Sequence, residues 1–196
     1  MKIIILGAGQ VGGTLAEHLA DEQNDITVVD ERAATLKRLQ ERLDIRTVLG
    51  NGAHPSTLLN AGAEDADMLI AVTDSDEINM LACSVAFTLY RTPTKISRVR
   101  SADYLAKHQA LFESGSIPVD VIIGPEQLVT KNIEQLIANP GSLQVLDFAE
   151  GRIRLVAVKA VAGGPIVGRE LQEIREHMPR VDTRVAAIFR RGGEPI

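Results

Sequence analysis

Aromatic residues are scarce in this chain of 196 residues. It has no tryptophan, two tyrosines and four phenylalanines, so its core must be built from Ile, Val, Leu and Ala. Binding of single-stranded nucleic acid by base stacking is disfavoured, because stacking needs aromatic platforms. The formal net charge of −5 also opposes contact with a phosphate backbone. We therefore expect no nucleic-acid partner.

Long apolar runs and disulfides are missing as well. No stretch approaches the roughly 20 apolar residues of a membrane-spanning helix, and the N-terminus lacks the basic region and long apolar core of a secretory signal. Cys83 is the only cysteine, which is typical of a reducing compartment. It lies in an apolar helical pattern and is interpreted as a buried filler. These features predict a cytoplasmic protein, and association with a membrane protein stays open.

Sequence patterns for catalysis are also absent. The chain has no C-x-x-C, H-E-x-x-H or P-loop pattern and no carboxylate pair with metal-ligand spacing. Of the four histidines, only His54 is expected near a ligand, and no acid–base partner can be named for it. We therefore expect no catalytic residue and no metal site, and the sequence favours a binding protein over a catalyst.

What the chain does have is a strand-like apolar run that leads into a G-x-G-x-x-G turn near its start. The first glycine permits the tight turn, the second lets the backbone approach a pyrophosphate, and the third allows close helix–strand packing. The helix that follows directs its free N–H groups and positive dipole end at the phosphates. The residues predicted to bind there are Gly7, Gly9, Gln10, Val11 and Gly12.

A second strand-like run ends in Asp30. A carboxylate at this point accepts hydrogen bonds from ribose hydroxyls and repels a 2′-phosphate, which favours NAD(H) or an adenosine nucleotide over NADP. Arg32 could weaken that preference by facing a phosphate. The alternative is that Asp30 only caps the next helix. The glycine turn and Asp30 together predict binding, but they do not predict hydride transfer.

Strand-like and helical patterns alternate up to about residue 123. This alternation predicts a parallel sheet with helices on both faces, and right-handed crossovers make it a doubly wound, Rossmann-like α/β fold. Ligands bind such sheets beyond the carboxyl ends of the strands, where the strand order reverses. The strands are predicted at Lys2–Leu6, Ile26–Asp30, Arg46–Leu49, Met68–Val72, Lys95–Val99 and Val119–Ile123.

Polar residues follow the third and fourth of these strands. Asn51 offers amide contacts to an adenine, or it belongs to a plain strand-to-helix turn. Thr73 and Asp74 are expected to face the crevice, because Ser75 or Asp76 should cap the next helix.

Two arginines flank the end of the fifth predicted strand. Arg98 or Arg100 could neutralise a phosphate with its bidentate fork. The alternative for each is a solvated surface side chain.

The pattern changes after residue 123. A helix over 125–138 carries an apolar stripe that either packs on its own sheet or contacts a second copy. The chain is therefore divided into a nucleotide-binding domain, 1–138, and a small, apparently truncated α+β lobe, 139–196. The lobe is predicted to contain strands at Leu143–Ala149, Arg152–Val161 and Arg184–Arg190 and a short helix at Gly168–Arg175.

A long block after the third strand carries a family resemblance. It runs VLGNGAHPSTLLNAGAEDADMLIAVTDSDEINMLAC, and ordinary dehydrogenases seldom have its G-N-G, L-x-x-A-G and A-D-x-L-I-A-V-T-x-x-D-E-x-N elements. Together with ILGAGQVGGTLAEHL and ITVVD, it resembles the N-terminal nucleotide-binding domain of the RCK, or KTN, family of potassium-transport regulators. The resemblance covers residues 1 to about 135. The lobe from about residue 140 resembles the start of that family's C-terminal ligand-binding subdomain.

The resemblance implies a cytoplasmic regulatory subunit that is not an enzyme. Its domains would dimerise and assemble into a homo-oligomeric ring at the inner face of the membrane, beneath a TrkH-like potassium transporter subunit. Exchange of NAD(H) against ATP or ADP would change the ring and gate ion flux. Gly7, Gly9 and Gly12 would bind phosphates and Asp30 the ribose, with Asn51, Thr73 and Asp74 on the adenosine and nicotinamide side and Arg98 or Arg100 near phosphate.

One departure from the family pattern bears on the ligand. Some relatives have an arginine between the second and third glycines, where this chain has Gln10. This favours NAD(H) over ATP. The alternative function is an NAD-dependent oxidoreductase with a Rossmann domain, which would also need a substrate pocket and a proton relay near the nicotinamide.

Overall fold

The computed structural model describes residues 1–22, 24–149, 151–164, 167–168, 170 and 184–190. They belong to two compact units, Met1–Val129 and Thr130–Ile196, and helix α6 (Pro125–Ala138) crosses the division. Within the described ranges, no helix combines the length and apolar character needed to cross a bilayer.

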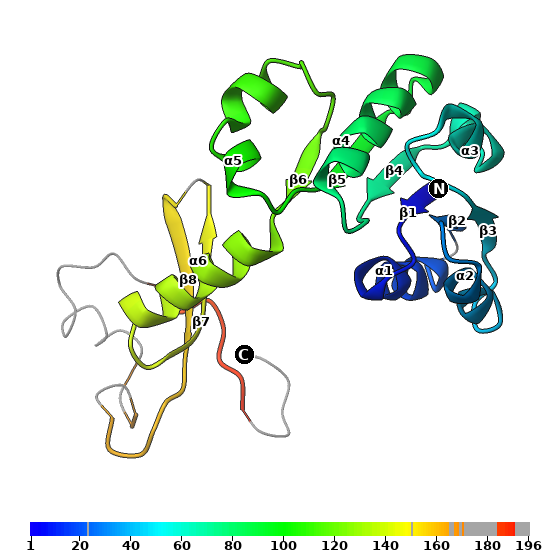
Figure 1. Ribbon diagram of the computed structural model, residues 1–196. Helices are drawn as coiled ribbons and strands as arrows, with labels where there is room; N and C mark the ends of the chain where they lie inside the picture. Colours follow the sequence, from blue (N-terminus) through cyan, green and yellow to red (C-terminus); the bar gives the residue numbers. More distant parts are fainter. Residues whose placement is uncertain (23, 150, 165–166, 169, 171–183, 191–196) are drawn as a thin grey trace. The chain divides into compact units, whose positions relative to one another are not determined.

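Six parallel strands form the sheet of the first unit (Figure 1). Their order is β3-β2-β1-β4-β5-β6, so the order reverses between β1 and β4. This confirms the predicted doubly wound, Rossmann-like sheet, with strand ends within two residues of the predicted ones. The strands are β1 (Lys2–Leu6), β2 (Asp25–Asp30), β3 (Arg46–Leu49), β4 (Met68–Ala71), β5 (Thr94–Arg98) and β6 (Val121–Ile123).

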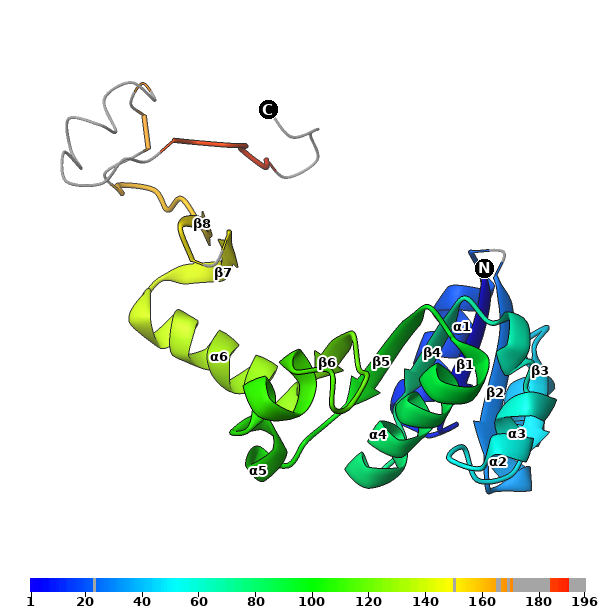
Figure 2. The ribbon, with the colours of Figure 1, turned by 90° about the horizontal axis from the view of Figure 1, so that it is seen from above.

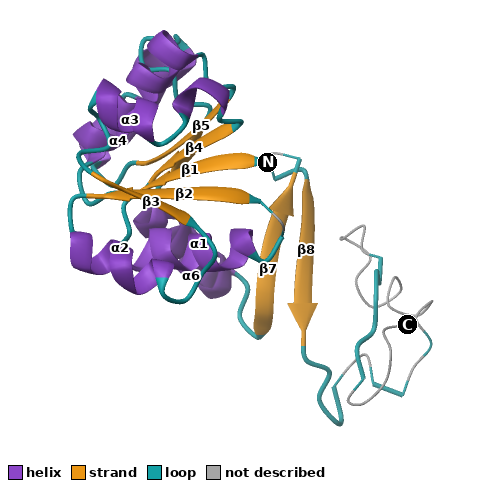
Figure 3. Cartoon of the chain, turned by 90° about the vertical axis from the view of Figure 1, so that its right-hand side faces the viewer, coloured by secondary structure: helices purple, strands orange, loops and turns teal. Residues whose placement is uncertain are grey.

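Helices connect the strands and cover both faces of the sheet. Figure 3 shows α1 and α2 on one face and α3 and α4 on the other. The helices are α1 (Gln10–Ala20), α2 (Ala33–Gln40), α3 (Pro55–Asn60), α4 (Asp76–Val85) and α5 (Ala102–Leu105). Short 3₁₀ or π-helical turns are η1 (Ala63–Asp65), η2 (Ala86–Tyr90) and η3 (Gln109–Glu113).

Strand β1 lies between the two halves of the core. Ile3 and Ile5 belong to the cluster under α1 and α2, whereas Ile4 and Leu6 belong to the cluster under α3 and α4. Burial on both faces explains why β1 is apolar from Ile3 to Leu6 instead of alternating. Cys83 is fully buried in the second cluster, and burial raises the pKa of its thiol to about 12. This confirms its interpretation as an unreactive filler.

The second unit contains an antiparallel hairpin, seen from another side in Figure 2. Strands β7 (Ser142–Phe148) and β8 (Ile153–Val158) pair from Phe148 with Ile153 to Ser142 with Val158, with a register shift between Ser142 and Gln144. Both strands were predicted from the sequence. The turn between them contains Gly151 at φ 82°, a conformation that glycine adopts without steric cost.

The predicted strand at Arg184–Arg190 is wrong. These residues have no regular secondary structure, because an extended segment becomes a strand only when its backbone pairs with a neighbour, and residues 184–190 pair with no described strand. The short helix predicted over Gly168–Arg175 lies largely outside the described residues. An apolar run alone therefore did not determine the structure of residues 184–190.

Gly12→Ala should destabilise the first unit strongly. A Cβ on Gly12 would lie 1.8 Å from the carbonyl oxygen of Gly7, a backbone atom that cannot move aside alone. We expect the free energy of unfolding, measured by urea denaturation, to fall by about 3 kcal/mol or more. Gly9→Ala is the matched control, since a Cβ there meets nothing within 4 Å and should cost less than about 1 kcal/mol. Equal losses in the two variants would contradict this account.

Candidate nucleotide-binding site

The loops after β1 to β5 meet at the carboxyl edge of the sheet, because the strands are parallel. The turn after β1 lies against the loop after β4, since a Cβ on Gly7 would be 3.0 Å from the backbone of Thr73. The loops after β2 and β3 are joined by Asn51, whose Nδ2 donates to Glu31 Oε1 at 2.9 Å. The loops after β4 and β5 are joined by Arg100, which donates to the carbonyl oxygen of Asp74. The predicted residues of all five loops therefore share one edge.

The first turn of α1 is open to a ligand. Gly9 occupies the N-cap position without a side-chain cap, and the first turn contains no acidic residue. The first helical hydrogen bond runs from the N–H of Gly13 to the carbonyl of Gly9, at 2.8 Å. The N–H groups of Gln10, Val11 and Gly12 precede it and have no partner within the helix. Such groups at the positive end of a helix suit a phosphate.

Asp30 contacts this turn directly. Its side chain is 8% exposed, and Oδ2 accepts a hydrogen bond of 2.7 Å from the N–H of Ala8, between the first two glycines. Oδ1 accepts from the N–H of Arg32 at 2.8 Å and from Arg32 Nε at 3.2 Å. Although burial raises it, the pKa of Asp30 ends below its ordinary value because these donors outweigh the burial. The carboxylate is therefore charged at neutral pH.

The alternative interpretation of Asp30 as a helix cap is wrong. Helix α2 begins at Ala33, and Arg32 occupies its N-cap position. Asp30 holds the end of β2 against the glycine turn instead.

A hollow of about 410 Å³ lies beside the glycine turn. Its three arginines lie in α2 or just outside its two ends. The lining comprises Ala8, Gly9, Gln10, Gly13, Thr14, Glu17, Arg32, Thr35, Arg38, Leu39 and Arg42. A larger hollow of about 770 Å³ includes the amino ends of β1 to β3, at the opposite edge. Of the predicted residues, Gly9 and Gln10 line the smaller hollow, so the candidate site at the carboxyl edge includes it. The larger hollow does not touch the turn of α1.

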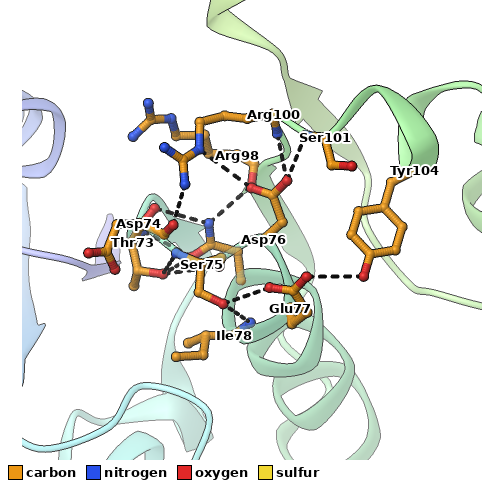
Figure 4. A network of polar contacts seen from close by, with 11 residues as sticks. Thr73, Asp74, Ser75, Asp76, Glu77, Ile78, Arg98, Arg100, Ser101 and Tyr104 are labelled. Carbon is orange, nitrogen blue, oxygen red and sulfur yellow. Dashed lines mark hydrogen bonds and ion pairs between the residues drawn. The ribbon is translucent and has the colours of Figure 1, made fainter.

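A polar network fixes the loops after β4 and β5 (Figure 4). Ser75 caps α4, as predicted, with Oγ accepting from the N–H of Ile78 at 3.2 Å. Asp76 Oδ2 accepts from the N–H groups of Arg100 and Ser101, at 2.9 and 2.8 Å. The carboxylate of Asp76 is 9% exposed. Its two hydrogen bonds fix the backbone of the loop after β5 to the start of α4.

Asn79 completes the network from the next turn of α4. It is fully buried, and its Oδ1 accepts from the N–H and the hydroxyl of Thr73, at 3.0 and 2.7 Å. Its Nδ2 donates to the carbonyl of Arg98 at 3.0 Å. One amide therefore fastens the ends of β4 and β5 together.

The predicted polar residues differ in how many hydrogen bonds and ion pairs they form within the chain. The amide of Asn51 is used within the loops, because its Oδ1 also accepts from the N–H of Ala53 at 2.9 Å. Arg100 Nε lies 3.7 Å from Asp76 Oδ1, and its side chain is 40% exposed. Arg98 is half-buried, and its Nε has no partner among the described residues. In Figure 4 a dashed line joins the guanidinium of Arg100 to Asp74.

Comparison with known proteins identifies the family. The TrkA-N domain matches residues 3–125. The chain belongs to the TrkA-N domain family. It is 62% identical over 98% of its length to the Trk system potassium uptake protein TrkA of Vibrio alginolyticus, and 65% identical over 97% to that of Halomonas elongata. It spans 42% of the length of each of these relatives. The family resemblance inferred from the glycine turn and the block after the third strand is thus confirmed.

Solved structures share the fold of the TrkA-N domain. The TrkA-N domain of the inner membrane protein ybaL from Escherichia coli aligns with a TM-score of 0.61 at 21% identity, over 69% of this chain and 96% of that one. The GsuK channel bound to NAD aligns with a TM-score of 0.55 at 21% identity, over 65% of this chain and 22% of that one. At these identities the likeness establishes the Rossmann-like fold alone.

Sequence reasoning missed three groups that organise the TrkA-N site. These are Asp76, Asn79 and the N–H of Ala8. Asp76 and Asn79 stand three positions apart in the D-E-x-N element, so they lie on one face of a helix, and this spacing was a usable signal. The N–H of Ala8 gave no signal in the sequence, because every residue except proline carries a backbone N–H donor. In the described ranges, no cluster of His, Cys, Asp or Glu could hold a metal ion.

Asn79→Ala should loosen the TrkA-N site and lower its stability. The N–H of Thr73 and the carbonyl of Arg98 would lose their partner, and unpaired buried polar groups cost about 1–3 kcal/mol each. We expect urea denaturation to show a loss of about 2–4 kcal/mol. Ser84→Ala is the control on the same helix, because Ser84 Oγ bonds only within α4, to the carbonyl of Met80. A loss for Asn79→Ala no larger than that of the control would refute this role.

Proposed function

We propose that this chain is the nucleotide-binding part of a regulatory subunit of potassium uptake. The observation that carries the proposal is the 62–65% identity, over nearly the whole chain, to proteins named for the Trk potassium uptake system. The chain spans 42% of the length of those relatives. Their regulatory role is therefore proposed for this chain on the basis of its similarity to that part. The functional boundary is placed at the end of α6, with the nucleotide domain at 1–138 and part of a second subdomain at 139–196.

The proposed ligand is NAD(H), with ATP or ADP as competing ligands. The open first turn of α1 supports a phosphate at Gly7, Gly9, Gln10, Val11 and Gly12. The charged Asp30 beside it supports an unphosphorylated ribose and disfavours a 2′-phosphate. Structures of the same fold bound to NAD and to ADP support both ligand classes. Asn51, Thr73 and Asp74 would line the rest of the ligand, with Arg98 or Arg100 near a phosphate.

The proposed partner is a membrane potassium transporter subunit, which the chain would contact from the cytoplasmic side as a homo-oligomer. Exposed apolar side chains repeat every four residues on α6, at Val129, Ile133 and Ile137, and this stripe supports a contact with a second copy. A nucleotide would gate transport only to the extent that it binds two states of the assembly unequally. A coupling of about 1–3 kcal/mol is typical of such regulation.

Gly9→Ala tests the nucleotide site. A Cβ on Gly9 points into open space, so the fold should persist, but the methyl group would occupy the space that a pyrophosphate needs. By calorimetry, wild type should bind NADH more tightly than NADPH, and Gly9→Ala should weaken NADH binding by about tenfold or more. Unchanged NADH affinity in a folded Gly9→Ala variant would remove the glycine turn from the site.

The regulatory role is tested in a full-length Trk system potassium uptake protein TrkA in which this chain replaces the matching part. Reconstituted in vesicles with its transporter, it should give a potassium flux that changes on addition of NADH, and the change should be lost in Gly9→Ala while basal flux stays. A flux insensitive to every nucleotide would overturn the regulatory proposal. Steady consumption of NADH with a panel of hydroxy and keto acids would instead favour an oxidoreductase.

A further inference from the structure

The carboxylate of Asp30 has little hydrogen-bonding capacity left for a ligand. A carboxylate offers about four acceptor positions, and the N–H of Ala8, the N–H of Arg32 and Arg32 Nε occupy three of them. A ribose contact alone does not account for these hydrogen bonds, which join Asp30 to its own chain. The shortest of these hydrogen bonds, 2.7 Å, comes from the N–H of Ala8 in the turn proposed to bind the phosphates.

The N–H of Ala8 lies between two backbone hydrogen bonds that hold the ends of the turn. The N–H of Gly7 is tied to the carbonyl of Val29 at 2.8 Å, and the helix ladder starts with the bond from Gly13 to Gly9. Ala8 lies between these points and is 4% exposed. Without Asp30 its buried N–H would lose its partner, which a folded protein tolerates poorly.

We propose that Asp30 is a positioning residue for the phosphate-binding turn, acting through the N–H of Ala8 on the diphosphate of every nucleotide that binds. The inference rests on the proposed nucleotide function and changes what Asp30 does within it. A ribose contact would make Asp30 matter only for ligands with ribose hydroxyls. A positioning role makes it matter equally for ligands that lack them.

A thermodynamic cycle separates the two roles. Calorimetry on the 196-residue chain would compare ADP with 2′,3′-dideoxy-ADP, in wild type and in Asp30→Ala. We expect Asp30→Ala to weaken both ligands by about tenfold or more, with the two losses agreeing within about threefold. A loss confined to ADP would overturn the proposal, because it would place the whole effect on the ribose hydroxyls.

Conservative and distant variants complete the test. Asp30→Asn keeps one acceptor for the N–H of Ala8 and should recover part of the lost affinity for both ligands. Asp25→Ala is the matched control, since Asp25 is exposed at the other end of β2 and should change neither affinity. If Asp30→Ala fails to fold, Asp30→Asn carries the same comparison of the two ligands.

Amide hydrogen exchange measures the turn without any ligand. The N–H of Ala8 should be protected in wild type and in Asp25→Ala, and it should exchange about tenfold faster or more in Asp30→Ala. Unchanged exchange would overturn the positioning role. Intact protection in a wild type that binds neither NADH nor ADP would instead count against the proposed function alone.

Discussion

The close approach of Gly12 to the carbonyl of Gly7 is the constraint on which the rest of the site depends. No side chain fits between them, since a Cβ on Gly12 would lie 1.8 Å from that oxygen. This close contact allows the chain to turn directly from β1 into α1, so that the first turn of the helix lies at the carboxyl edge of the sheet. Asp30, at the end of β2, accepts a hydrogen bond from the middle of the turn, so two neighbouring strands hold the glycine turn in place.

The other half of the edge is organised differently. The loops after β4 and β5 are held by side chains from the start of α4, with Asp76 on the backbone after β5 and Asn79 on the ends of both strands. These contacts are partly buried, which reduces the competition from water. Arg100 stays partly exposed, and Arg98 Nε has no partner among the described residues.

The sequence predicted the centre of the sheet well, because β1, β2 and β4 are largely buried and carry apolar runs. It failed at Arg184–Arg190, where an apolar segment lacks a described strand to pair with. It also left the role of Asp30 open between a ribose contact and a helix cap. The structure excludes the cap and adds a hydrogen bond from the N–H of Ala8 that neither interpretation contained. The carboxylate faces Ala8, and no residue pattern could have indicated a partner that is a backbone N–H.

The sequence by itself determined the parallel sheet, the glycine turn and the family, because each follows from local residue types and their spacing. Only the tertiary structure decided which groups are joined. Asp30 with Ala8, Asp76 with Arg100, and Asn79 with Arg98 lie 19 to 24 positions apart. Their contacts exist because parallel strands bring their carboxyl ends to one edge, a consequence of the strand order that local spacing does not contain.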